Sequence, residues 1–134
     1  MNAKRILIVD DQPLVLRVLR LALERADYVV ETQPNGVAAL ESILDAPPDA
    51  LITDIEMPEM DGRALCEQID LQLPRRNFPI FVATSLTSLE HRHWSNSVRD
   101  LAFLEKPLSA RKLLTTLARY FQDQTVIRAK TTAS

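Results

Sequence analysis

Four apolar segments of this chain each run directly into a side chain that can take part in chemistry. The segments are ILIV, ALIT, FPIFVA and LAFLE. Parallel strands that are covered on both faces read as continuous apolar runs, and their carboxyl ends share one edge of an open sheet. The sequence therefore predicts one crevice that gathers the side chains at these ends, which are Asp10, Asp11, Asp54, Thr84 and Lys106.

This set of groups is suited to phosphoryl transfer. Carboxylates can hold a hard divalent cation, whereas an ammonium and a hydroxyl can hold a phosphoryl group. One carboxylate is then left to act as the nucleophile.

Composition limits the class of protein. A chain of 134 residues with 46% hydrophobic residues is expected to form one domain with a real core. The net charge of -2 and the absence of a Lys/Arg-rich block argue against a nucleic-acid binder. A single cysteine, Cys66, cannot form an internal disulfide, and the apolar run after MNAKR is too short for a signal peptide or a membrane span. We expect a cytoplasmic protein that does not enter a membrane.

Strand patterns alternate with helix patterns along the chain. Strands are expected at Ile6–Val9, Tyr28–Thr32, Ala50–Thr53, Pro79–Ala83 and Leu101–Glu105. Helices are expected at Pro13–Ala26, Val37–Leu44, Gly62–Leu71, Ser88–Val98 and after a Ser109 cap as far as Phe121. Five strands and five helices in alternation predict a three-layer α/β sandwich with right-handed crossovers. Few large apolar residues follow Phe121, so we expect a domain at 1–121 and a frayed helix end with a disordered tail or linker stub at 122–134.

The order and spacing of ILIVDDQ, LITDIEMPEMDG, VATS and FLEKP resemble the receiver domain of two-component response regulators. The resemblance extends from Lys4 to Phe121 and implies a flavodoxin-like, doubly wound sheet with strand order 2-1-3-4-5. It also implies a signalling switch that takes a phosphoryl group from a histidine kinase or a histidine phosphotransfer protein. Such a domain catalyses its own phosphorylation and a slow autodephosphorylation.

The resemblance assigns roles residue by residue. Asp54 matches the phosphoacceptor, and Asp10 and Asp11 match the acidic pair that binds Mg²⁺ with it, Asp10 acting through metal-bound water. The backbone carbonyl of Glu56 matches a further metal ligand. Lys106 matches the lysine that pairs with a phosphoryl oxygen.

Thr84 and Phe103 match the switch pair of the family. The hydroxyl residue moves toward the phosphoryl group, and the aromatic ring turns into the space that is vacated. Ordinary structural roles remain as alternatives, because a strand-ending threonine and a core aromatic are common. Asp11 as a helix N-cap and Lys106 as a loop residue before proline are further alternatives.

The first expected helix has an apolar face that is wider than a core stripe requires. Its predicted core stripe consists of Val15, Val18, Leu19 and Ala22. Leu14 and Leu21 lie together beyond the edge of that stripe. They suggest docking of a partner's helical bundle beside the active edge, and scattered surface leucines are the alternative.

Rival classes fit the motifs less well. An aspartate-nucleophile phosphatase of the haloacid dehalogenase type needs Asp-x-Asp after its first strand, and a nucleotide-binding module needs a glycine-rich loop. The chain has neither. The open alternatives concern context: a stand-alone regulator, a receiver from a larger transcription factor or hybrid kinase, or a receiver used mainly as an interaction module. A phosphorylation-dependent dimer is also open.

Overall fold

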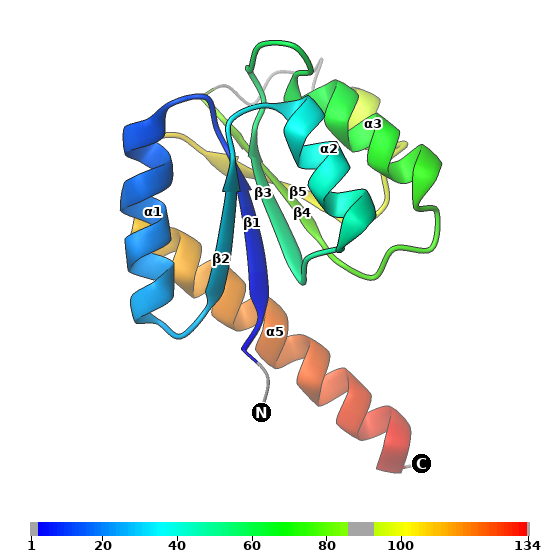
Figure 1. Cartoon of the computed structure of the whole chain (residues 1–134). Coiled ribbons are helices and arrows are strands. Elements are labelled where there is room, and N and C mark those ends of the chain that lie inside the picture. The colour runs from blue at the N-terminus through cyan, green and yellow to red at the C-terminus, as the bar shows by residue number, and fades with distance from the viewer. Residues whose placement is uncertain (1–2, 86–92, 134) are drawn as a thin grey trace.

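The β-strands of the computed structural model form one parallel sheet in the order β2-β1-β3-β4-β5 (Figure 1). The structure describes residues 3–85 and 93–133, with side chains described as far as residue 122. The predicted flavodoxin-like fold and strand order are confirmed. The strands are β1 (Arg5–Val9), β2 (Val29–Gln33), β3 (Ala50–Asp54), β4 (Ile80–Thr84) and β5 (Leu101–Glu105).

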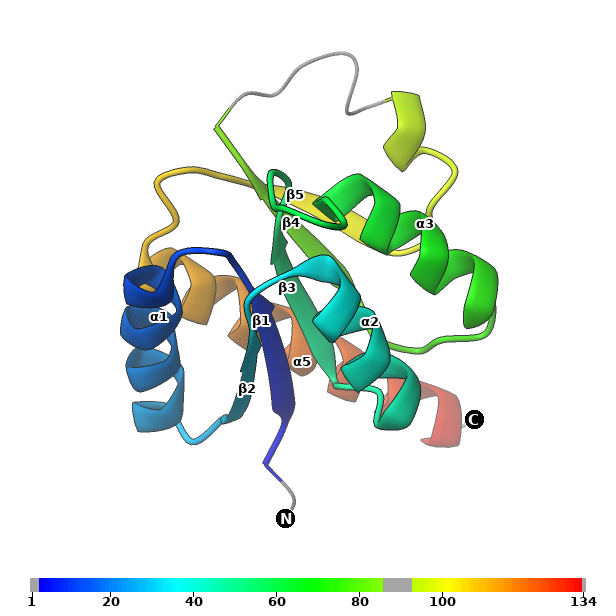
Figure 2. The same cartoon turned by 45° about the horizontal axis from the view of Figure 1, so that its top comes forward.

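Helices cover both faces of the sheet and give three layers. They are α1 (Pro13–Arg25), α2 (Gly36–Asp45), α3 (Gly62–Gln72) and α5 (Ala110–Ala133). Helices α1 and α5 pack together on one face, and α2 and α3 pack together on the other (Figures 1 and 2). Each face has its own apolar cluster, because β1, β3 and β4 are buried on both sides.

Short polar side chains fix where three of the helices begin. Asn35 Oδ1 accepts a hydrogen bond from Ala38 N at 2.8 Å, and Asp61 Oδ1 accepts one from Ala64 N at 2.8 Å. Ser109 caps α5 as predicted, since its Oγ accepts from Lys112 N at 3.0 Å. These caps satisfy backbone donors that lack a partner within the helix.

The segment between β4 and β5 differs from its prediction. Residues 93–95 form a helical turn and residues 96–100 are turns and bends, so the predicted helix does not reach Val98. One reason is that the Ser97 hydroxyl donates to the Trp94 carbonyl at 2.7 Å and competes with helical hydrogen bonding. The first part of the predicted helix falls on 86–92, outside the described residues.

Helix α5 is longer than predicted. The expectation of a disordered tail after Phe121 was wrong for the backbone, which remains helical to Ala133. No glycine or proline lies between Phe121 and Ala133, so nothing stops a helix that is already anchored by Leu113 and Leu117. Neither α5 nor any other helix of the described chain is long and apolar enough to cross a membrane.

The core stripe of α1 is also rotated relative to its prediction. Val18 is 53% exposed, whereas Leu23, which was outside the predicted stripe, is fully buried. Leu19 is buried as expected, because it lies one turn before Leu23 on the face toward the sheet. Val18 therefore joins the exposed apolar residues of the helix instead of its core.

Candidate functional site

The five predicted side chains come from the carboxyl ends of four strands. Asp54 and Thr84 are the last residues of β3 and β4, and both are buried. Asp10 and Lys106 directly follow β1 and β5. Because all these strands are parallel neighbours, one edge of the sheet carries the whole set.

Lys106 contacts the predicted acceptor directly. Its Nζ lies 2.6 Å from Asp54 Oδ1, and its backbone N donates to the Thr84 carbonyl at 2.9 Å. The contact with Asp54 is an ion pair, and no donor of the described residues points at Asp54 Oδ1 along a hydrogen-bonding direction. The side chain of Asp54 is 4% exposed and that of Lys106 is 33% exposed, so one charge is buried and the other reaches solvent.

Three carboxylates form a compact acidic group. One oxygen each from Asp10, Asp11 and Asp54 lies within 4.8 Å of the others. Burial raises the pKa of Asp10 above its usual range; a hydrogen bond from Gln12 N, 2.9 Å from Asp10 Oδ1, opposes that rise, and the Asp54 charge adds to it. Like charges this close repel one another, and a cation among them would relieve the repulsion.

A hard divalent cation fits this group. All three side chains offer carboxylate oxygens, and no histidine or cysteine belongs to the group, which favours Mg²⁺ or Ca²⁺ over zinc. Asp54 Oδ1 is buried and accepts no hydrogen bond from the described residues, so a bound cation can supply the partner that this oxygen lacks. The donor atoms of this group therefore fit the Mg²⁺ that the family resemblance implies.

Both glycines of the chain pack against the backbone of the acceptor segment 54–61. A Cβ on Gly62 would lie 2.4 Å from Asp54 O and 2.8 Å from the Cα of Ile55. A Cβ on Gly36 would lie 2.3 Å from Met60 O. The sequence predicted Gly62 as the start of a helix, but it did not show that both glycines pack against this segment.

Phe103 of β5 is half-buried and packs on the apolar cluster beneath α2 and α3. Its ring meets that of Trp94 edge to face, with centroids 5.9 Å apart and planes at 84°. Phe103 therefore lies where the alternative interpretation placed it, as a strand residue packed on the core. The switch role of Phe103 and Thr84 stays a prediction.

The ordinary structural roles considered for Asp11 and Lys106 are wrong. The N-cap of α1 is Gln12, with no side-chain cap, so Asp11 does not cap the helix. Lys106 is not merely a loop residue before proline, since it pairs with Asp54.

Glu56 is exposed, and the role of its carbonyl stays a prediction. Cys66 is a buried thiol whose pKa burial raises to about 12, which makes it inert as a nucleophile.

The fold and the acidic edge define a class of protein. Residues 6–118 match the family model of the response regulator receiver domain. The chain belongs to this family, and its general role is that of a phosphoacceptor in two-component signalling. Receiver domains generally bind Mg²⁺ at an acidic pocket, as the group above would allow, and histidine kinases are their usual partners.

Named relatives agree with that assignment. The chain is 38% identical over 110 residues to the response regulator MprA of Mycobacterium ulcerans, covering 82% of this chain and 47% of the relative. It thus spans about half the length of the curated relatives it matches. Among solved structures, the chemotaxis protein CheY4 of Vibrio cholerae superposes with a TM-score of 0.80 at 31% identity, covering 88% of this chain and 98% of that one. A CheY-like receiver domain protein of Methanospirillum hungatei gives 0.83 at 30% identity, with 92% and 98% covered.

Proposed function

We propose that this domain accepts a phosphoryl group on Asp54 from the phosphohistidine of a histidine kinase or histidine phosphotransfer protein, with Mg²⁺ bound at Asp10, Asp11 and Asp54. The observation that carries the proposal is the position of Asp54. Its buried carboxylate lies 2.6 Å from Lys106 Nζ and belongs to the group of three acids within 4.8 Å. No other carboxylate of the described residues combines an ion pair with lysine and such an acidic group.

The chemistry has one electrostatic obstacle. A carboxylate and a phosphoryl group are both anionic, and bound Mg²⁺ supplies the positive charge that offsets their repulsion. Asp10, Asp11, Asp54 and the Glu56 carbonyl would hold the ion. An Asp54 oxygen forms the new P–O bond as the P–N bond of phosphohistidine breaks, and the electron pair stays on the imidazole nitrogen.

Two residues of the chain stabilise the transferred group. The Lys106 ammonium exchanges part of its contact with Asp54 for a phosphoryl oxygen, and the Thr84 hydroxyl donates to another. Thr84 ends β4, the neighbour of β3, and Lys106 directly follows β5, the next strand beyond β4. The domain therefore promotes its own phosphorylation and, when water attacks the acyl phosphate, its own slow dephosphorylation.

A labelling experiment tests the proposed function. The wild-type protein, incubated with a radiolabelled small phosphodonor such as acetyl phosphate and Mg²⁺, should take up label that hydroxylamine releases, because an acyl phosphate is cleaved by this nucleophile. Chelation of Mg²⁺ should suppress the uptake. Failure to label, or label that resists hydroxylamine, would reject the proposal.

The acidic pair should contribute unequally to the metal site. Asp10 Oδ1 already accepts a hydrogen bond from Gln12 N, whereas Asp11 is exposed and free to ligate. We expect Asp11→Ala to weaken Mg²⁺ binding more than Asp10→Ala, whose loss should be about 10- to 100-fold as for groups that orient metal ligands. Isothermal titration of the two variants gives the order, and equal losses would contradict it.

The switch should depend on the Thr84 hydroxyl. Trp94 is the only tryptophan of the chain and its ring touches that of Phe103, so its emission reports movement of the Phe103 ring. We expect phosphorylation to change Trp94 emission in the wild type and not in Thr84→Ala, which should still accept label. Thr115→Ala, on the exposed face of α5, is the matched control. The wild-type emission change in Thr84→Ala would disprove the coupling.

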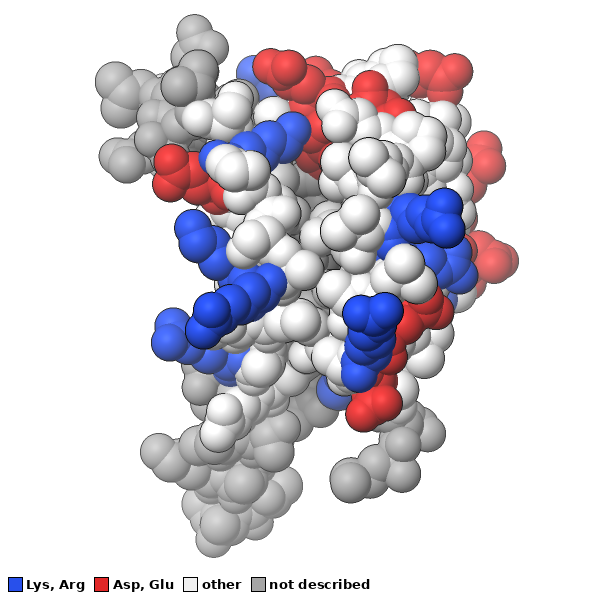
Figure 3. Space-filling model, turned by 90° about the vertical axis from the view of Figure 1, so that its left-hand side faces the viewer, with Lys and Arg blue, Asp and Glu red and all other residues white. Residues whose placement is uncertain are grey.

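Helix α1 carries the proposed docking surface for the phosphodonor. Three apolar residues of α1 are exposed: Leu14 (72%), Val18 (53%) and Leu21 (48%). Their spacing puts them on one side of the helix. In Figure 3 the face formed by α1 and α5 shows uncharged surface with Lys and Arg side chains on both sides of it, and Asp and Glu side chains at its top and lower right. The apolar stripe and the Lys and Arg side chains beside it suit a partner helix with an apolar and acidic face.

Leu14→Ala and Leu21→Ala should therefore slow phosphotransfer from the cognate histidine donor, by about 10-fold if either residue is a binding hot spot. Labelling by acetyl phosphate should not change. Leu71→Ala is the control, because Leu71 is 74% exposed on α3, on the opposite face of the sheet. Equal slowing with both donors, or by the control, would remove α1 from the docking surface.

The wider context remains part of the proposal. A cytoplasmic location suits a domain that draws phosphoryl groups from histidine kinases. The domain is either a stand-alone regulator or the receiver of a longer chain, and 122–134 serves as tail or linker. We expect it to act without direct contact to nucleic acid, through an output partner or a phosphorylation-dependent dimer.

A further inference from the structure

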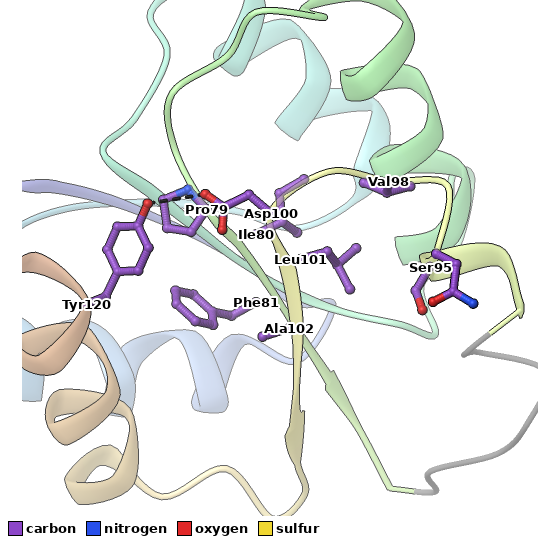
Figure 4. A pocket seen from close by; sticks show the side chains of 10 residues that line it. Pro79, Ile80, Phe81, Ser95, Val98, Asp100, Leu101, Ala102 and Tyr120 are labelled. Atoms are coloured by element: carbon purple, nitrogen blue, oxygen red, sulfur yellow. Dashed lines mark hydrogen bonds between the residues drawn. The ribbon is translucent and has the colours of Figure 1, made fainter. Parts of the chain in front are cut away.

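A pocket of about 410 Å³ lies at the amino ends of β4 and β5 (Figure 4). Asp54 lies at the opposite, carboxyl ends of the strands. Asp100 and Tyr120 lie toward one end of it, and Ser95 lies at the other. Between them, Leu101 packs on the apolar cluster of one sheet face and Phe81 belongs to the cluster of the other. The pocket therefore straddles the outer edge of β5.

Among the described residues, Asp100 is the only charged one that lines this pocket. Its backbone has φ of 52°, and its carbonyl accepts a hydrogen bond from Ile80 N at 2.9 Å, which ties it to β4. The Tyr120 hydroxyl donates to Asp100 Oδ2 at 3.2 Å, and the Tyr120 ring stands edge-on to Phe81 at 6.2 Å. The carboxylate is thus positioned by its neighbours before any ligand arrives.

The carboxylate retains unused capacity as an acceptor. An ionised carboxylate offers about four lone-pair sites, and Tyr120 occupies one. No Lys or Arg of the described chain forms an ion pair with Asp100. A pocket with a fixed negative charge and aromatic walls suits a cation, and guanidinium in particular, because it forms paired hydrogen bonds with carboxylate and stacks on rings.

Strand β5 supplies a backbone surface next to this pocket. Among the described residues it is an edge strand that pairs only with β4, so the N–H and C=O groups along its other side have no strand partner there. Ala102 is exposed and small, which leaves room for another backbone to approach. A peptide that adds to such an edge directs alternate side chains to the same face, so one of them can enter the pocket.

We propose that the pocket binds an arginine side chain of a partner protein's extended segment, which pairs with the outer edge of β5. Asp100 accepts from the guanidinium, and Phe81, Leu101 and Tyr120 surround its apolar stem. An acidic or phosphorylated segment would meet like charge at Asp100. The proposal does not rest on phosphorylation of Asp54, which lies at the opposite ends of these strands.

A peptide titration followed by amide chemical shifts tests the proposal in the unphosphorylated full chain. The probe is acetyl-Thr-Val-Arg-Val-Thr-amide, and its control carries citrulline, a neutral analogue, in place of arginine. We expect saturable shifts at Leu101, Ala102 and Phe103, with affinity about 10-fold weaker for citrulline because a charge-assisted pair is lost. Asp100→Asn should weaken arginine-peptide binding similarly, while asparagine still tolerates the left-handed backbone and accepts from Tyr120.

Asp27→Asn is the matched control. Asp27 is exposed, has φ of 71° and precedes β2 at the other edge of the sheet, so its substitution removes the same charge from the same kind of backbone. It should leave affinity unchanged. Absence of saturable shifts at β5, equal affinity for the two peptides, or equal weakening by Asp27→Asn and Asp100→Asn would each overturn the proposal.

Discussion

Asp54→Asn should abolish phosphorylation of this domain by every donor. Asparagine keeps the shape of the side chain but lacks the anionic oxygen that forms the P–O bond, and it removes one of the three acids of the metal group. The expected loss is complete within the detection limit of labelling. The fold should persist, because Lys106 is 33% exposed and water can replace its ion-pair partner.

Asp61→Asn provides the matched control for this result. Asp61 lies in the same segment and caps α3 by accepting from Ala64 N, a role that asparagine performs equally well. Its labelling should equal that of the wild type, and circular dichroism should show all three proteins folded. Label that persists in folded Asp54→Asn would show that another residue is the acceptor.

Gly62→Ala should impair both stability and phosphorylation. The added Cβ would meet Asp54 O at 2.4 Å and the Cα of Ile55 at 2.8 Å, and backbone atoms cannot rotate away as a flexible side chain can. The hydrogen bond from Gly62 N to Ile55 O, 2.8 Å long, would also be displaced. We expect a loss of about 1–3 kcal/mol in unfolding free energy, as in overpacked cores, and about 100-fold in labelling rate, as when a reacting group moves by 1 Å.

Urea unfolding and initial labelling rates at saturating Mg²⁺ measure the two effects. Arg63→Ala, at the next position of α3, is the control, since it removes only the exposed ion pair with Glu67, worth a few tenths of a kcal/mol. Gly62→Ala with wild-type stability and rate would show that the close contact with Asp54 does not position the acceptor.

The sheet could be predicted because β1, β3, β4 and β5 are apolar runs whose patterns need no knowledge of their neighbours. The strand order was predicted from the resemblance to receiver domains. The convergence of Asp54 and Lys106 was predicted because the carboxyl ends of parallel strands lie together. The distance of 2.6 Å between Lys106 Nζ and Asp54 Oδ1 is a tertiary contact that no spacing in the sequence encodes.

Other features depended on tertiary contacts and were missed or misplaced. Val18 and Leu23 exchange core and surface roles because the orientation of α1 is set by the sheet beneath it. The packing of Gly36 and Gly62 against the acceptor segment could not be predicted, because it is a tertiary contact that no local pattern in the sequence shows.

The central claim is that the Asp54 carboxylate is the phosphoacceptor, and direct mapping of the modified residue tests it. The wild type would be phosphorylated with acetyl phosphate and Mg²⁺, treated with borohydride to convert the acyl phosphate to a stable alcohol, digested, and sequenced by tandem mass spectrometry. We predict that the reduced residue occurs at position 54 alone. Modification at any other position, or none in protein that has taken up label, would contradict the claim.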